Sequence, residues 1–288
     1  ACIGQIEYLK SSDEFYLSEP AKKVLAETDH PAYLGGMFQS VVSIYDTVNH
    51  LPECFRSGTG HSFDDKGESC ACGIERMSRK FQADHLVPDL LPQIDGMVER
   101  LKAGASIADV GCGGATSTIA MARAFPNSQF TGYDISLHAL DRAQNNINAA
   151  GVKNLVLHNP VDQPLPEDAS FDFITTFDVI HDSTHPDQLI SAIRHSLKED
   201  GAWLCADVKG LPTFAENLED NPMATLAYSF SVLVCMSAGL STADGAGLGT
   251  LGFHKDKARE MTKANGFSRF REVPFEGDAF NAFYDIRP

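Results

Sequence analysis

Basic residues are scarce in this chain of 288 residues, because 23 lysines and arginines stand against 39 aspartates and glutamates, a formal net charge of −16. Proteins that bind nucleic acid or an anionic membrane surface need a basic patch, so we expect no nucleic-acid and no membrane partner. Long apolar runs are also missing, since no stretch approaches the roughly 20 residues of a membrane-spanning helix. No secretory signal is visible. We therefore expect a cytoplasmic location.

The cysteines do not suggest a disulfide framework. Their number, seven, is odd, and Cys112 falls in a glycine-rich turn while Cys205 falls in an apolar run. A reduced, intracellular compartment is the simplest explanation. The C-x-C pair of Cys70 and Cys72 lacks the second pair or nearby histidine that a zinc site needs. We therefore expect no metal site.

One stretch, I-A-D-V-G-C-G-G-A-T at residues 107–116, predicts a ligand site. Its first apolar positions are typical of a strand buried in a parallel sheet. Glycines at 111, 113 and 114 let a ligand lie against bare backbone, and a helical pattern begins near Thr116. The N-terminus of a helix offers unpaired N–H groups to an anionic or polar ligand. The alternative is an ordinary tight turn.

The third glycine of the dinucleotide fingerprint G-x-G-x-x-G is absent. Gly111 and Gly113 fit it, but Thr116 occupies the third position. The pattern D-x-G-x-G does fit, with Asp109 placed to reach a ligand from below. This favours a nucleoside with a charged tail over a pyrophosphate, so an NAD(P)-linked oxidoreductase is the less favoured alternative.

From residue 105 onward, apolar runs and helical patterns alternate, which predicts an α/β fold with a doubly wound, Rossmann-like sheet of seven strands. Residues 210–252 are too long for an ordinary connection, and we expect them to form a lid after the fifth strand. The segment before the sheet is mostly helical, with a hairpin in residues 1–17 and a loop over 56–73. We therefore predict two units, 1–100 and 101–288.

Carboxylates follow three of the predicted strands, at the edge where open α/β sheets bind ligands. Asp134 closes the second strand and is placed to accept hydrogen bonds from ribose hydroxyls, or only to begin a helix. Asp162 follows the third strand and either accepts from an adenine amino group or is a solvated loop residue. Asp178, His181 and Asp182 follow the fourth strand.

These residues together resemble the class I S-adenosylmethionine (SAM)-dependent methyltransferases. D-V-G-C-G-G-A at 109–115 is similar to the first motif of that family, with Ala115 in place of its third glycine, and F-D-F-I-T-T-F-D at 171–178 is similar to its fourth. The resemblance implies SAM as cofactor and S-adenosylhomocysteine (SAH) as product. It implies cofactor contacts from Asp109, Gly111, Cys112, Gly113, Ala115, Asp134, Ile135, Asp162, Phe177 and Asp178.

A closer resemblance is to small-molecule methyltransferases with an N-terminal winged-helix segment. It extends over nearly the whole chain through D-H-P-A-Y-L-G-G (29–36), F-R-S-G-T-G (55–60), F-D-V-I-H-D (177–182), D-N-P (220–222) and G-F-S-R-F (266–270). Residues 1–17 are similar to the wing hairpin of a module whose first helices are missing here. This implies a small-molecule acceptor and a homodimer. A SAM- or nucleoside-binding regulator that uses the winged-helix remnant is the alternative.

Methyl transfer needs a general base only if the nucleophile still carries a proton. His181 and Asp182 lie where the methyl group would emerge, so His181 either takes a proton from the acceptor or has a packing role. The resemblance implies that Tyr33, Phe38, Arg56 and Tyr228 line the acceptor pocket. The accepting atom, whether oxygen, nitrogen, sulfur or carbon, stays open.

Overall fold

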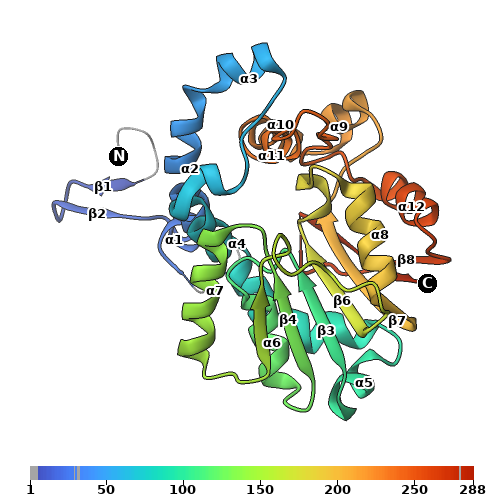
Figure 1. Cartoon of the computed structure of the whole chain (residues 1–288). Helices are drawn as coiled ribbons and strands as arrows, with labels where there is room; N and C mark the ends of the chain where they lie inside the picture. Colours follow the sequence, from blue (N-terminus) through green and yellow to red (C-terminus); the bar gives the residue numbers. More distant parts are fainter. Residues whose placement is uncertain (1–5, 29, 31–32, 279) are drawn as a thin grey trace.

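The central element is a seven-stranded sheet in the order β5-β4-β3-β6-β7-β9-β8, which confirms the expected fold class (Figure 1). The computed structural model describes residues 6–28, 30, 33–278 and 280–288. Strand β9 runs in the opposite direction to the other six strands of this sheet. The strands are β3 (Ser106–Val110), β4 (Gln129–Tyr133), β5 (Leu155–His158), β6 (Phe171–Phe177), β7 (Leu197–Val208), β8 (Arg269–Val273) and β9 (Asn281–Arg287).

Helices cover both faces of the sheet, because its strands are apolar on both sides. In β3, Ile107 and Ala108 are both fully buried, and they belong to two different core clusters. Successive strand residues point to opposite faces, so each cluster marks one face. The first face packs against α5 (Met97–Ala103), α6 (Thr116–Ala124) and α7 (Leu137–Ala150), and the second against α8 (Pro186–Ser196) and α12 (Lys255–Ala264).

The segment before the sheet contains a hairpin and several helices, as predicted. These are β1 (Glu7–Leu9), β2 (Glu14–Tyr16), α1 (Glu19–Leu25), α2 (Gly35–Val48), α3 (Leu51–Ser57), the 3-10 turn η1 (Asp64–Lys66) and α4 (Gly67–Asp84). Asp29, Pro31 and Ala32, part of one matching motif, lie outside the described residues.

The predicted loop over 56–73 is wrong in its second half, because α4 already begins at Gly67. One of its glycines, Gly73, serves helix packing. A Cβ on Gly36 of α2 would lie 2.5 Å from the backbone oxygen of Gly73 in α4, so only small residues allow the two backbones to approach this closely. After α4 the chain turns through η2 (Leu86–Leu90) and η3 (Leu91–Gln93), where Pro88 and Pro92 interrupt the helical pattern.

The predicted lid is helical and lies beyond the carboxyl ends of the strands (Figure 1). It contains α9 (Phe214–Asp220), α10 (Ala224–Leu233) and α11 (Cys235–Gly239). The lid contacts the N-terminal segment directly, because the amide of Gly60 donates to the Leu240 carbonyl at 2.8 Å and the amide of His61 to the Ser237 hydroxyl at 2.9 Å. Within the described chain, no helix is both long and apolar enough to cross a membrane.

Candidate active site

A cavity of about 720 Å³ opens at the carboxyl ends of β3, β4 and β6. This volume lies in the range of about 300–1,000 Å³ that small-molecule sites occupy. The chain crosses here from β5, at one end of the sheet, to β6, next to β3. Open α/β sheets bind ligands at such a switch point. The N-terminal helices and the lid complete the cavity wall.

The glycine-rich turn after β3 forms one wall of this cavity. Gly111 and Gly113 have positive φ angles of 72° and 54°, which favour glycine. A Cβ on Gly111 would overlap the side chain of Val179, so the turn packs directly against the loop after β6. A Cβ on Gly113 would have no described protein atom within 4 Å. Gly113 therefore borders open space that a ligand can fill.

Asp134, at the end of β4, holds this turn in place. One carboxylate oxygen accepts from the amide of Gly113 at 2.8 Å, and the other from the amide of Ser136 at 2.8 Å. Burial raises the pKa of Asp134, while these two amides favour its ionised form. The carboxylate lines the cavity, and each of its oxygens can accept a second hydrogen bond.

The structure does not place Asp109 on the cavity, although the resemblance implies a cofactor contact from it. Asp109 is fully buried below the turn and does not line the cavity. Its carboxylate accepts hydrogen bonds from the hydroxyls of Ser117, Thr118 and Thr175, the first at 2.7 Å and the last at 2.8 Å. Burial raises the pKa of Asp109. This residue therefore ties β3, β6 and the start of α6 together beneath the site.

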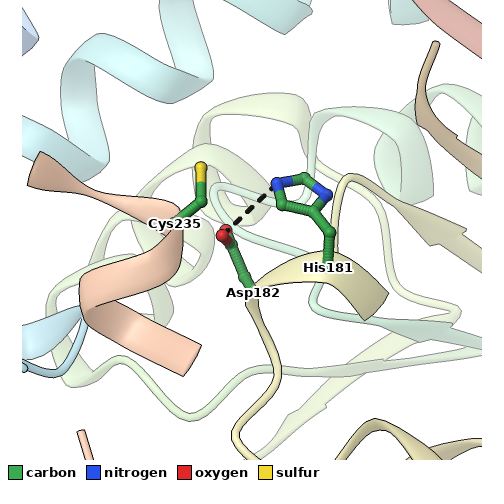
Figure 2. A group of neighbouring side chains, drawn as sticks. All are labelled: His181, Asp182 and Cys235. Atoms are coloured by element: carbon green, nitrogen blue, oxygen red, sulfur yellow. Dashed lines mark ion pairs between the residues drawn. The ribbon is translucent and has the colours of Figure 1, made fainter. Parts of the chain in front are cut away.

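His181 and Asp182 both line the cavity, as predicted, on the 3-10 turn η4 (Ile180–Asp182). The Nδ1 atom of His181 lies 2.6 Å from a carboxylate oxygen of Asp207, and its Nε2 atom lies 3.3 Å from Oδ1 of Asp182. Figure 2 shows Cys235, on α11 of the lid, beside Asp182. Asp207 thus fixes the orientation of the imidazole ring and leaves Nε2 directed to Asp182 and the cavity.

Charges around His181 determine its protonation. Burial opposes a positive charge on the imidazole, but the carboxylates of Asp207 and Asp182 outweigh it and raise the pKa of His181 well above its ordinary value. Asp178 also lines the cavity, and burial together with the charge of Asp207 raises its pKa to about 7. The carboxyl groups of Asp178, Asp182 and Asp207 therefore gather around His181.

Metal-ligating atoms also approach one another here. The sets His181–Asp182–Cys235 and Asp178–His181–Asp207 each place their ligand atoms within 4.8 Å of one another. The six described cysteines are free thiols, and Cys70 and Cys72 do not belong to either set. The hydrogen bond between Asp207 and Nδ1 of His181 occupies one of the nitrogen atoms that a metal would need.

Another part of the cavity wall is apolar. Its side chains come from α2, α4, the lid and their connecting loops, and include Met37, Ile44, Phe63, Ile74, Met77, Leu226, Phe230, Val234 and Leu251. Polar atoms are few on this side; one is the Thr250 hydroxyl, which is buried and has no hydrogen-bond partner in the described chain. The wall therefore fits a largely apolar molecule.

Two predicted pocket residues, Phe38 and Tyr228, lie on the wrong side of their helices. One residue turns a helix by about 100°, so Met37 faces the cavity while Phe38 is 55% exposed. In α10, Phe230 lines the cavity, whereas Tyr228 packs against Phe214 with ring centroids 5.0 Å apart. The segments were predicted correctly, and the facing positions were not.

Four other residues that were predicted to contact the cofactor or the acceptor also lie away from the cavity. The Tyr33 hydroxyl accepts a hydrogen bond from Nη2 of Arg76 at 3.0 Å. Arg56 forms an ion pair with Glu53 on the outer surface of α3. Asp162 is an exposed loop residue, as in the solvated alternative. Ala115 is fully buried in the core, at the residue that precedes α6. By contrast, the structure places Cys112, Ile135, Phe177 and Asp178 on the cavity wall, as predicted.

Comparison with known sequences identifies the family. The profile described as "Methyltransferase domain" matches residues 101–266, more than half of the chain. The chain belongs to this methyltransferase family. The matched part contains the glycine turn, Asp134 and His181. The predicted resemblance and the prediction of an enzyme are thereby confirmed.

Individual relatives of this methyltransferase are distant. A release factor glutamine methyltransferase of Rhodopirellula baltica is 29% identical over 115 residues, which are 39% of this chain and 38% of that relative. The structure of a proposed O-methyltransferase from Nostoc punctiforme has a TM-score of 0.73 at 14% identity, covering 99% of this chain and 81% of that one. Human N-acetylserotonin methyltransferase, in complex with SAM, has a TM-score of 0.67 at 15% identity, covering 99% and 79%. These structures share the fold of this methyltransferase over nearly its whole length.

Proposed function

We propose that this methyltransferase transfers a methyl group from SAM to a hydroxyl group of a small, largely apolar acceptor. The observation that carries the proposal is His181, whose Nδ1 is held by Asp207 while Nε2 is directed to the cavity. A hydroxyl carries a proton that must leave, and an imidazole held in this way can take it. Two proteins named above share this fold, one described as a proposed O-methyltransferase and the other solved in complex with SAM. Their likeness supports the same assignment.

The residues at the strand ends fit the cofactor. The space beside Gly113 admits a ligand chain close to the backbone, and Asp134 offers two carboxylate oxygens that fit vicinal ribose hydroxyls. Ile135 is 61% exposed and lines the same part of the cavity, so it offers an apolar surface to an adenine ring. When bound, SAM supplies a methyl group on a positively charged sulfur.

The chain's own residues then align the acceptor, exclude water and accept its proton. The apolar wall from α2, α4 and α10 holds the acceptor and covers the site from solvent. Nε2 of His181 takes the hydroxyl proton, and Asp207 stabilises the resulting imidazolium. Asp182, whose Oδ1 lies 3.3 Å from Nε2 of His181, limits where the acceptor hydroxyl can sit.

Calorimetry tests the cofactor assignment. We expect SAM and SAH to bind the protein and NAD to show no binding. Asp134→Ala should lower the affinity for SAH by about 10-fold or more, because charge-assisted hydrogen bonds contribute about 1.5–3 kcal/mol. Asp200→Ala, which removes an exposed carboxylate that pairs with Arg100, is the matched control and should change nothing. Binding of NAD together with no binding of SAM or SAH would overturn the proposal.

The pH dependence of the reaction tests the role of Asp207. A base works in its unprotonated form, so the rate should rise with pH through the raised pKa of His181. Asp207→Asn removes a negative charge that stabilises the imidazolium, so the rising limb should move by about 1 pH unit or more toward lower pH. The maximal rate should fall as well, because the base is weaker. A limb that stays in place would show that another group controls the rate.

Exposed apolar side chains favour a homodimer, which we also propose. They gather on the hairpin and on the outer side of α2 and include Tyr8, Leu9, Phe15, Val42 and Tyr45. Figure 1 shows the hairpin projecting away from the remainder of the chain. A patch of this kind is typical of an interface. The winged-helix origin of the hairpin, the unit boundary near residue 100 and the cytoplasmic location stay predictions.

A further inference from the structure

We propose that Glu75, on α4, binds the α-ammonium group of the cofactor's methionine tail. This inference rests on the proposed use of SAM. It assigns a binding role to a residue that lies before the matched domain, which begins at residue 101. Four observations carry it: the burial of the carboxylate, its contact with the glycine turn, its pairing with Arg142 and its one unpartnered oxygen.

Glu75 is a charged residue in an apolar region. It is only 6% exposed, and yet it lines the cavity. Burying a carboxylate is costly unless it is paired, and glutamate is rarely buried without such a partner. The position therefore calls for cationic groups around the carboxylate, of which Arg142 is one.

The carboxylate touches the turn that borders the proposed cofactor. A Cβ added to Gly114 would overlap the Oε2 atom of Glu75, so these two residues are in direct contact. The Gly114 carbonyl in turn accepts from the side-chain amide of Asn146 at 2.8 Å, which fixes the turn against α7. Glu75 is thereby placed beside the glycine turn, where the charged end of the methionine tail would lie.

Arg142, on α7, pairs with only one of the two carboxylate oxygens. Its Nε and Nη2 atoms lie 2.9 and 2.8 Å from Oε2 of Glu75. The Oε1 atom accepts no hydrogen bond from any residue that the structure describes. Arg142 thus orients the carboxylate, and Oε1 stays available to a donor that enters through the cavity.

The charges fit one end of the tail. A methionine tail carries an α-ammonium and an α-carboxylate, and only the ammonium is attracted to Glu75. A charge-assisted hydrogen bond to a buried carboxylate is roughly twice as strong as a neutral one. The contact would also link cofactor binding to the position of α4, which supplies Ile74 and Met77 to the acceptor wall.

Ligands that differ only in the tail test this assignment by calorimetry. SAH carries the full tail, its deaminated analogue lacks only the amino group, and 5′-methylthioadenosine lacks the amino acid end. For Glu75→Gln we expect SAH to bind about 10- to 100-fold more weakly. Binding of the deaminated analogue and of 5′-methylthioadenosine should not change. The wild-type protein should lose a similar factor when SAH is replaced by its deaminated analogue, because the two changes remove the same contact.

Two controls separate this role from a structural one. Glu99→Gln removes the charge of an exposed glutamate that pairs with Lys102 and should leave all three affinities unchanged. Glu75→Asp keeps the negative charge but shortens the side chain, so it should weaken the binding of SAH and leave the binding of 5′-methylthioadenosine unchanged. This variant keeps the test valid if the glutamine variant is unstable. An equal loss for all ligands, or no loss for SAH, would overturn the inference. If the wild-type protein binds none of the ligands, the proposed function itself is wrong.

Discussion

Replacing His181 by glutamine should lower kcat by about 10²–10⁴-fold, the usual contribution of a general base, and leave the affinity for SAH unchanged. Glutamine can still donate a hydrogen bond to Asp207, so the buried carboxylate keeps a partner, but its amide cannot accept a proton. Single-turnover measurements with labelled SAM and a hydroxyl acceptor found by screening would measure the effect directly.

The matched control is His195→Gln, which changes an exposed histidine on α8 and should leave kcat unchanged. Retention of full activity by the His181 variant would support the alternative weighed from the sequence, a histidine with a packing role only. It would also favour an acceptor whose nucleophile carries no proton at the start of the reaction.

The second large effect concerns the glycine turn. Gly113→Ala should lower the affinity for SAH by about 10- to 100-fold, because the added methyl group enters the space that the ligand would fill. Gly113 has a φ of 54°, so the variant should also lose about 1–2 kcal/mol of stability from its strained backbone.

Gly151→Ala separates these two contributions. Gly151 ends α7 with a φ of 68°, and a Cβ there has no described protein atom within 4 Å. The two variants should therefore lose similar stability in thermal unfolding, but only Gly113→Ala should lose affinity for SAH. If both variants bind SAH with the same affinity, the ligand does not pass over Gly113.

The alternation of strands and helices after residue 105 predicted the sheet, because the central strands are apolar on both faces and several helices begin and end at recognisable residues. The caps at Ser136 and Gly151 are examples, since the Ser136 hydroxyl accepts from Ala139 and Gly151 has a positive φ at the end of α7. Local signals of this kind depend on neighbouring residues only. They also located His181 and Asp134 at the correct edge of the sheet.

Contacts between distant segments were harder to predict. The burial of Asp109 depends on three hydroxyls, one of them on β6, that fold back upon it. Glu75 lies within α4, where part of the helix was predicted as a loop. Its two partners, Arg142 and Gly114, come from α7 and from the glycine turn after β3. The facing positions of α2 and α10 depend on helix rotation, which a pattern of apolar residues does not fix to one residue.

The apolar wall of the cavity comes almost entirely from two segments, residues 37–82 and 221–251, which lie outside the parallel strands. The loops that would hold the donor follow β3, β4 and β6 instead. Apart from Glu75, which lies in the first segment but contacts the glycine turn, changes in one set of positions therefore need not disturb the other. Over evolutionary time the chain can acquire new acceptors through substitutions in its helices while the donor loops stay as they are, and the same division makes residues such as Met37 and Phe230 the natural positions at which to engineer acceptor choice.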